Sequence, residues 1–145
     1  ADQFLQNRSL HEEVFGPFSL LVVYRDQAEL LEVLAALDGQ LTASVFGLEE
    51  ELVASHAIYP VLAEKAGRVI INGVPTGVEV CHAMQHGGPF PATTDPRFTS
   101  VGTSAIKRFA RPVAFQGFAD SLLPDALKEE NVLAIWRTID GEWIK

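Results

Sequence analysis

The stretch that decides the fold is His11-Glu12-Glu13-Val14-Phe15-Gly16-Pro17 together with the run that follows it, Phe18-Ser19-Leu20-Leu21-Val22-Val23-Tyr24. The first part is a charged turn that ends at a Gly-Pro pair, and the second part is almost entirely apolar. A continuous apolar run of this length is typical of a strand that is buried on both faces of a sheet. The stretch therefore predicts a loop that enters a buried strand from a ligand-facing surface.

Helix and strand patterns alternate after this run. Asp26 is placed to cap a helix that Gly39 would end, and apolar residues recur through it at helical spacing. We expect a strand over residues 41–46, a second helix that opens at residues 49–51 and is interrupted by Pro60, and a third strand over residues 68–72. This order with short connections predicts an α/β fold with a parallel sheet.

The second half of the chain is less regular. Residues 73–102 are rich in Gly, Pro and Thr, and they start at the carboxyl end of a predicted strand, where parallel sheets bind ligands. A helix is predicted over residues 103–110 and a short one over residues 124–128. The tail predicts a β-hairpin with arms 132–139 and 142–144 around Asp140-Gly141, with Trp136 and Trp143 on opposite arms.

Composition limits the classes of function. The 145 residues are 48% hydrophobic, enough for one domain with a core, and no apolar run is long enough to cross a membrane. The net charge of −8 argues against a nucleic-acid partner. Acidic residues gather in 26–64 and basic residues in 96–119, which fits solvated faces or, alternatively, an anionic ligand or partner at the basic stretch. Cys81 is the single cysteine, which suits the cytoplasm.

Glu13 and Phe15 are the first candidates for a binding site. A carboxylate can accept hydrogen bonds from both hydroxyls of a ribose, and an aromatic ring can cover one face of a nicotinamide. Taken singly, the two residues are more simply a surface glutamate and a core phenylalanine. The whole run E-E-V-F-G-P, however, resembles the C-terminal part of the catalytic domain of NAD(P)-dependent aldehyde dehydrogenases. Further segments resemble that family in the same order, namely L-T-A-S-V-F (41–46), G-R-V-I-I-N (67–72) and H-G-G-P-F-P-A-T-T (86–94).

The resemblance implies a fold, an activity and a set of partners. The fold would be part of a three-layer parallel α/β catalytic domain over residues 1–130, followed by an oligomerisation hairpin over residues 131–145. The activity would be oxidation of an aldehyde to a carboxylic acid with NADP or NAD. Glu13 and Phe15 would contact the nicotinamide end of the cofactor, and Phe90 would touch the aldehyde. The partners would be the aldehyde, the remainder of the enzyme chain and further copies in a dimer or tetramer.

The sequence departs from the family at one loop and lacks part of its machinery. Pro91-Ala92-Thr93-Thr94 replaces the double glycine of the usual P-F-G-G anchor loop. This variant most resembles the branch that oxidises α-ketoglutaric semialdehyde (2,5-dioxopentanoate), often with NADP. The family's catalytic cysteine and general-base glutamate precede the E-x-F-G-P motif. We therefore expect no catalytic residue in this segment, and no dehydrogenase turnover from it alone.

Other residues leave alternatives open. Cys81, His82 and His86 could form a thiol nucleophile or part of a metal site, but a small buried thiol with two polar loop residues is the simpler interpretation, and no metal ligand is expected. Arg97 and Thr99 could bind a substrate carboxylate or the loop backbone, and the backbone is favoured. The alternative to a dehydrogenase segment is a non-catalytic α/β module that acts through binding or assembly.

Overall fold

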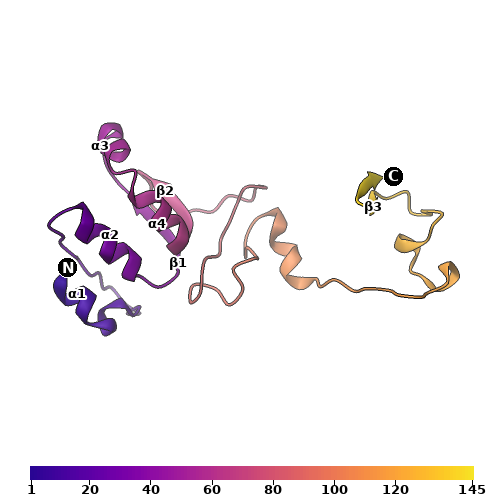
Figure 1. Cartoon of the computed structure of the whole chain (residues 1–145), viewed down its shortest axis with the longest axis horizontal. Helices are drawn as coiled ribbons and strands as arrows, with labels where there is room; N and C mark the ends of the chain where they lie inside the picture. The colour runs from indigo at the N-terminus through magenta and orange to yellow at the C-terminus, as the bar shows by residue number, and fades with distance from the viewer. The chain divides into compact units, whose positions relative to one another are not determined.

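Residues 1–110 contain a two-stranded parallel sheet, which confirms the parallel pairing predicted from the sequence. The computed structural model describes residues 1–145 and divides them into two units, 1–110 and 111–145. Strand β1 covers Gln40–Val45 and β2 covers Ala66–Ile71. The two strands lie side by side (Figure 1), and their register runs from Gln40 opposite Ala66 to Val45 opposite Ile71.

Helix α2 covers Gln27–Ala36 and begins at the predicted cap. The Asp26 carboxylate accepts a 2.9 Å hydrogen bond from the Glu29 amide, which satisfies one of the free N–H groups of the first turn. Glu29 is buried, and its carboxylate accepts from the backbone amide of Arg25 (2.6 Å) and from the Arg25 guanidinium (2.7 Å). The helix ends at Ala36, with Leu37 as its C-cap residue, and not at Gly39, which the structure uses for a different purpose.

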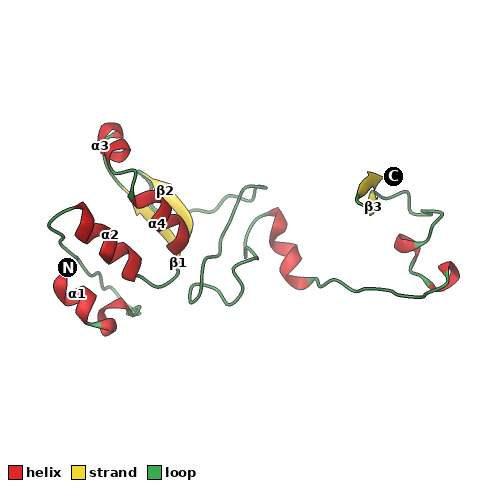
Figure 2. Ribbon diagram, viewed as in Figure 1, coloured by secondary structure: helices red, strands yellow, loops and turns green.

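The second helical segment is divided in two, as Pro60 predicts. Helix α3 covers Glu49–Ala54 and α4 covers Ile58–Lys65, so Pro60 lies in the first turn of α4, where its missing N–H is tolerated. Two further short helices precede α2: α1 over Asp2–Gln6 and the 3₁₀ helix η1 over Arg8–His11. Helix α2 packs against both α1 and α4, and α4 packs against β2 (Figure 2). The buried apolar core is small and consists of Phe4, Val33, Ile58, Leu62 and Ala66.

The predicted buried strand over residues 18–24 is not formed, and this expectation was wrong for the chain by itself. The segment is extended but pairs with no strand, and Leu21 and Val23 are largely exposed. Its one tie to the N-terminus is a 2.8 Å hydrogen bond from the amino group of Ala1 to the carbonyl of Val23. A strand needs a neighbour that supplies N–H and C=O groups, and neither β1 nor β2 lies beside this segment as a pairing partner.

The long stretch 73–102 contains no helix or strand, as predicted. The helix that follows it is the 3₁₀ helix η2 over Thr103–Phe109, rather than an α-helix. No helix of the structure is both long enough and apolar enough to traverse a lipid bilayer.

The second unit, residues 111–145, ends in the predicted hairpin. Its elements are the 3₁₀ helices η3 (Asp120–Leu122) and η4 (Asp125–Leu127) and the antiparallel strands β3 (Arg137–Ile139) and β4 (Glu142–Ile144). Asp140 (φ 52°) and Gly141 (φ 88°) both adopt the positive φ that a tight type I′ turn requires. The first arm is shorter than predicted. Trp143 lies opposite Thr138, so the two tryptophans do not face each other directly.

The boundary between the two units, after residue 110, differs from the domain boundary predicted after residue 130. The structural division concerns compactness, whereas the predicted boundary concerns oligomerisation. An oligomerisation segment at residues 131–145 therefore stays a prediction.

Candidate functional site

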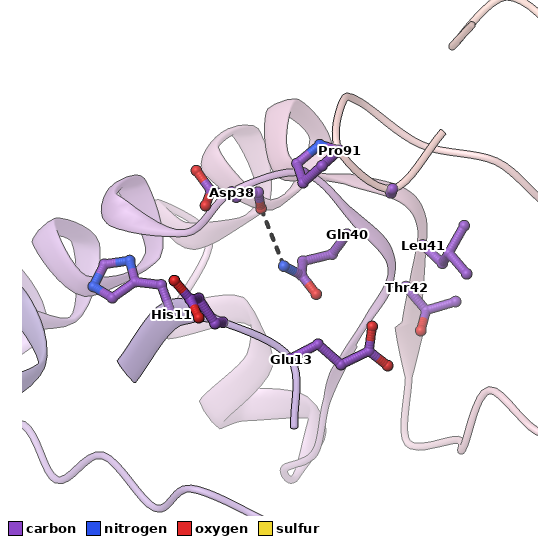
Figure 3. Close-up of a pocket in the computed structure, with 10 residues that line it drawn as sticks. His11, Glu13, Asp38, Gln40, Leu41, Thr42 and Pro91 are labelled. Carbon is purple, nitrogen blue, oxygen red and sulfur yellow. Dashed lines mark hydrogen bonds between the residues drawn. The ribbon is translucent and has the colours of Figure 1, made fainter. Parts of the chain in front are cut away.

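Glu13 lines a pocket of about 620 Å³ in the first unit (Figure 3). Three separate segments form its walls: residues 11–13, residues 38–42 and residues 91–92. The second of these segments leads into β1, so the pocket lies at the amino end of that strand. We expected a site at the carboxyl ends of the strands. The long loop leaves the carboxyl end of β2, but it returns to the amino ends by Gly87 and Gly88, which approach Gly67 and Gln40.

The Glu13 carboxylate is a free acceptor in the pocket. Glu13 is exposed and forms no hydrogen bond to another protein group. Figure 3 shows its carboxylate directed toward Thr42, with the side chain of Gln40 between it and Asp38. Gln40 donates a 3.3 Å hydrogen bond to the Asp38 carbonyl, and the Asp38 carboxylate is paired with Arg8 at 3.1 Å. Because Asp38 already has a cation, Glu13 and its neighbour Glu12 remain as the unpaired negative charges.

The other two predicted site residues lie outside this pocket. Phe15 is 91% exposed and follows Glu13 by two residues on the same segment. Phe90 is 76% exposed and directly precedes the wall residues Pro91 and Ala92. The structure thus brings Glu13 together with the loop that carries Phe90, and leaves both aromatic side chains largely exposed.

His11 fixes the start of the segment that carries Glu13, a role that sequence reasoning missed. Its ring stacks on Phe4 with centroids 4.1 Å apart and planes inclined by 3°. Nε2 lies 2.8 Å from the Phe4 carbonyl oxygen, and Nδ1 lies 3.2 Å from the Ala36 carbonyl oxygen. His11 therefore ties this segment to both α1 and the end of α2. Gln40 and Thr42 were also missed, because only the fold places them opposite Glu13.

Thr99 binds the loop backbone, which confirms the interpretation favoured from the sequence. It is buried, accepts a 2.8 Å hydrogen bond from the His86 amide and donates at 2.6 Å to the Val101 carbonyl. Arg97 does not bind the backbone, and this interpretation was wrong. Its guanidinium pairs with the Asp95 carboxylate at 2.6 Å, and that hydrogen bond lowers the pKa of Asp95 to about 2.

Cys81, His82 and His86 do not form the arrangement that a helix would give. Residues 81–86 lie in loop and turn structure, so the two histidines share no helix face. Nδ1 of His82 lies 3.0 Å from the Thr103 hydroxyl. No group of three His, Cys, Asp or Glu side chains is arranged to hold a metal ion.

Comparison with known proteins finds extensive sequence similarity to characterised bacterial enzymes. The chain is 54% identical over 142 residues to Alpha-ketoglutaric semialdehyde dehydrogenase 2 of Azospirillum brasilense, which is 98% of this chain and 27% of that protein. The chain is homologous to this dehydrogenase over nearly its whole length. It is also 53% identical over 135 residues to Alpha-ketoglutaric semialdehyde dehydrogenase of Acinetobacter baylyi, which is 93% of this chain and 26% of that protein. The chain thus spans about a quarter of the length of the curated relatives it matches. No family model matches it.

This dehydrogenase-like segment leaves much apolar surface exposed. No large side chain is fully buried, and rings as large as Phe15 and Phe109 are 91% and 84% exposed. A second pocket of about 450 Å³ opens between α2, α4 and residues 20–22, and most of its lining side chains are apolar. Extensive exposed apolar surface is a feature of protein–protein interfaces and of ligand-binding grooves.

Proposed function

We propose that this chain is the rear part of an NAD(P)-dependent dehydrogenase that oxidises α-ketoglutaric semialdehyde, or a closely similar aldehyde, to the carboxylic acid. The observation that carries the proposal is the 54% identity over 98% of the chain to a protein with that name. The match spans 142 residues, so the aligned region includes the loop at 86–94 as well as the strands.

The exposed apolar surface supports a larger parent fold. Five buried apolar residues are a small core for 110 residues, and the two parallel strands are a small sheet. Parallel sheets are normally covered on both faces. We infer that the remainder of the enzyme chain covers these residues and completes a three-layer α/β catalytic domain.

Glu13 and Phe15 are proposed to hold the nicotinamide end of the cofactor. Glu13 carries a free carboxylate in a pocket, which fits the two adjacent hydroxyls of a ribose because each hydroxyl can donate to one carboxylate oxygen. Phe15 offers an exposed ring that can lie against the nicotinamide. When bound, NAD(P)⁺ supplies the hydride acceptor of the oxidation. The part of this chain is to bind and orient, with Phe90 proposed to line the aldehyde pocket.

The tail is proposed to join copies of the enzyme into a dimer or tetramer. Strands β3 and β4 form an isolated two-stranded ribbon with unpaired outer edges, and Trp136 and Trp143 are 63% and 71% exposed. A lone hairpin is marginally stable and gains from joining another sheet.

We place the enzyme in the cytoplasm, a location that the single cysteine suits.

The test is an assay of the polypeptide encoded by the complete reading frame that contains these residues. We expect oxidation of 2,5-dioxopentanoate with NADP⁺ or NAD⁺, and no turnover from residues 1–145 alone. A reading frame without an upstream cysteine and glutamate, or a complete protein without aldehyde oxidation, would instead favour a non-catalytic binding or assembly module.

A further inference from the structure

Three glycines allow one loop to press its backbone against the start of the parallel sheet. A Cβ atom added at Gly67 would lie 1.7 Å from the carbonyl oxygen of Gly87, and one added at Gly39 would lie 2.2 Å from the carbonyl oxygen of Pro89. A Cβ at Gly88 would lie 2.3 Å from the carbonyl oxygen of Gln40. We call this contact between residues 87–90 and the amino ends of β1 and β2 the glycine seam.

The seam depends on space and not on unusual backbone angles. Ordinary van der Waals contact of a Cβ begins at 3.4 Å. Even at Gly88, where the contact is longest, a Cβ would therefore have to move the facing backbone by about an ångström. In each case the atom that is met belongs to the backbone, which cannot swing aside as a flexible side chain can. Any side chain at Gly67 must therefore move the loop away from the sheet or move the strand.

Hydrogen bonds within the loop fix its shape at the seam. The Thr93 hydroxyl donates to the Gly88 carbonyl at 2.6 Å, and the Ala92 amide donates to the Pro89 carbonyl at 2.8 Å. One residue before the seam, the His86 amide is fixed by the buried Thr99. The loop therefore has little freedom to relax.

The seam continues directly into the wall of the Glu13 pocket. Pro91 and Ala92 follow the pressed residues and line the pocket. Figure 3 shows Pro91 across the pocket from Glu13, with Gln40 between them. Gln40 takes part in both features, since its carbonyl meets Gly88 and its side chain lines the pocket. A shift of the loop must therefore change the distance between this wall and Glu13, and must move Phe90 with it.

We propose that Gly39, Gly67 and Gly88, together with Thr93, are positioning residues that set the width of the Glu13 pocket and the placement of Phe90. This inference rests on the proposed function for its kinetic consequence. None of these residues needs to touch substrate or cofactor. Their effect is to hold the loop at the separation from Glu13 at which the aldehyde and the nicotinamide end of the cofactor both fit.

The kinetic test uses substitutions at Thr93 in the complete protein. Thr93→Val keeps the shape but removes the hydrogen bond to Gly88, and we expect KM for aldehyde and cofactor to rise about three- to tenfold with kcat nearly unchanged, as for loss of uniform binding. Thr93→Ser restores the donor and should recover most of the loss. The matched control is Thr94→Val, since Thr94 is exposed and forms no hydrogen bond. Equal KM values for Thr93→Val and Thr94→Val would overturn the proposal.

Gly67→Ala is the more severe variant, with Gly77→Ala as its control because a Cβ at Gly77 meets nothing within 4 Å. We expect Gly67→Ala to raise KM by at least about tenfold, because small misplacements of binding groups are costly, and Gly77→Ala to match the wild type. If Gly67→Ala does not fold, the comparison of Thr93→Val with Thr94→Val tests the proposal.

A second readout separates this inference from the proposed function. With 4-fluorophenylalanine at position 90 as the probe, the ¹⁹F resonance should shift in Gly67→Ala and Thr93→Val and stay in place in Gly77→Ala and Thr94→Val. A protein without aldehyde oxidation would refute the proposed function, and the ¹⁹F comparison would still test the seam. Resonances that coincide in all four variants would contradict the seam as a positioning device.

Discussion

The amide of His86 and the hydroxyl of Thr99 are joined by a 2.8 Å hydrogen bond inside a loop that has no regular secondary structure. The Thr99 side chain is 4% exposed, and its hydroxyl also donates to the Val101 carbonyl. One buried hydroxyl therefore supplies the hydrogen-bond partners of the His86 amide and the Val101 carbonyl, which a neighbouring strand would supply in a sheet. This bond holds the entry to the glycine seam.

Thr99→Val should destabilise the fold, because it leaves the His86 amide and the Val101 carbonyl without their partner. Buried polar groups that lose their partner cost about 1–3 kcal/mol in the free energy of unfolding. The measurement is chemical denaturation of the complete protein. The control is Thr94→Val, because the hydroxyl of Thr94 forms no hydrogen bond. Equal midpoints for the two variants would show that the Thr99 hydroxyl does not support the loop.

Asp26→Ala should weaken α2 by about 1 kcal/mol, the usual cost of losing an N-cap acceptor. The Asp26 carboxylate accepts from the Glu29 amide, and alanine leaves that donor unsatisfied. Asp26→Asn keeps an acceptor oxygen and should retain most of the stability. The midpoint of urea unfolding distinguishes the two variants, and an asparagine variant as unstable as the alanine variant would argue against capping as the cause.

Asp95 should titrate about two pH units below a free aspartate. Its hydrogen bond to Arg97 lowers its pKa from 3.8 to about 2. Because the pKa is lowered by folding, the stabilisation is fully present above pH 3.8 and is lost as the pH falls toward 2. Carboxyl ¹³C NMR should show this titration in the wild type and a return toward 3.8 in Arg97→Gln. A wild-type Asp95 that titrates near 3.8 would rule out the pair.

Glu13→Gln should raise KM for NAD(P)⁺ in the complete protein by about tenfold. The substitution replaces one carboxylate oxygen by an NH₂ group and removes the negative charge, and hydrogen bonds to charged groups contribute about 1.5–3 kcal/mol. The control is Glu12→Gln, which removes the same charge from a neighbouring residue that lines the same pocket. Steady-state kinetics with varied cofactor should separate them. Similar effects from both substitutions would indicate a general loss of charge and no specific role for Glu13.

Local patterns in the sequence predicted the elements that form from local interactions. Asp26 capped α2, Pro60 divided the second helical segment, and Asp140-Gly141 formed the hairpin turn. The run at residues 18–24 failed for the opposite reason. Its apolar pattern is real, but a strand forms only with a partner, and the chain by itself provides none.

The candidate site was only partly predictable. Glu13 was found because it belongs to a recognisable run, whereas Gln40 and Thr42 carry no motif and face Glu13 only through the fold. Gly39 was taken for a helix end, since glycine commonly has that role, but the structure requires it for the close approach of Pro89. Such tertiary contacts between distant segments leave no periodic signal in the sequence.

A crystal structure of the complete protein with NAD(P)⁺ tests the central claim most directly. We expect both hydroxyls of the nicotinamide ribose within hydrogen-bond distance of the Glu13 carboxylate, at about 2.5–3.0 Å between oxygen atoms. A bound cofactor whose nicotinamide end lies away from Glu13, with that carboxylate facing bulk solvent, would contradict the account.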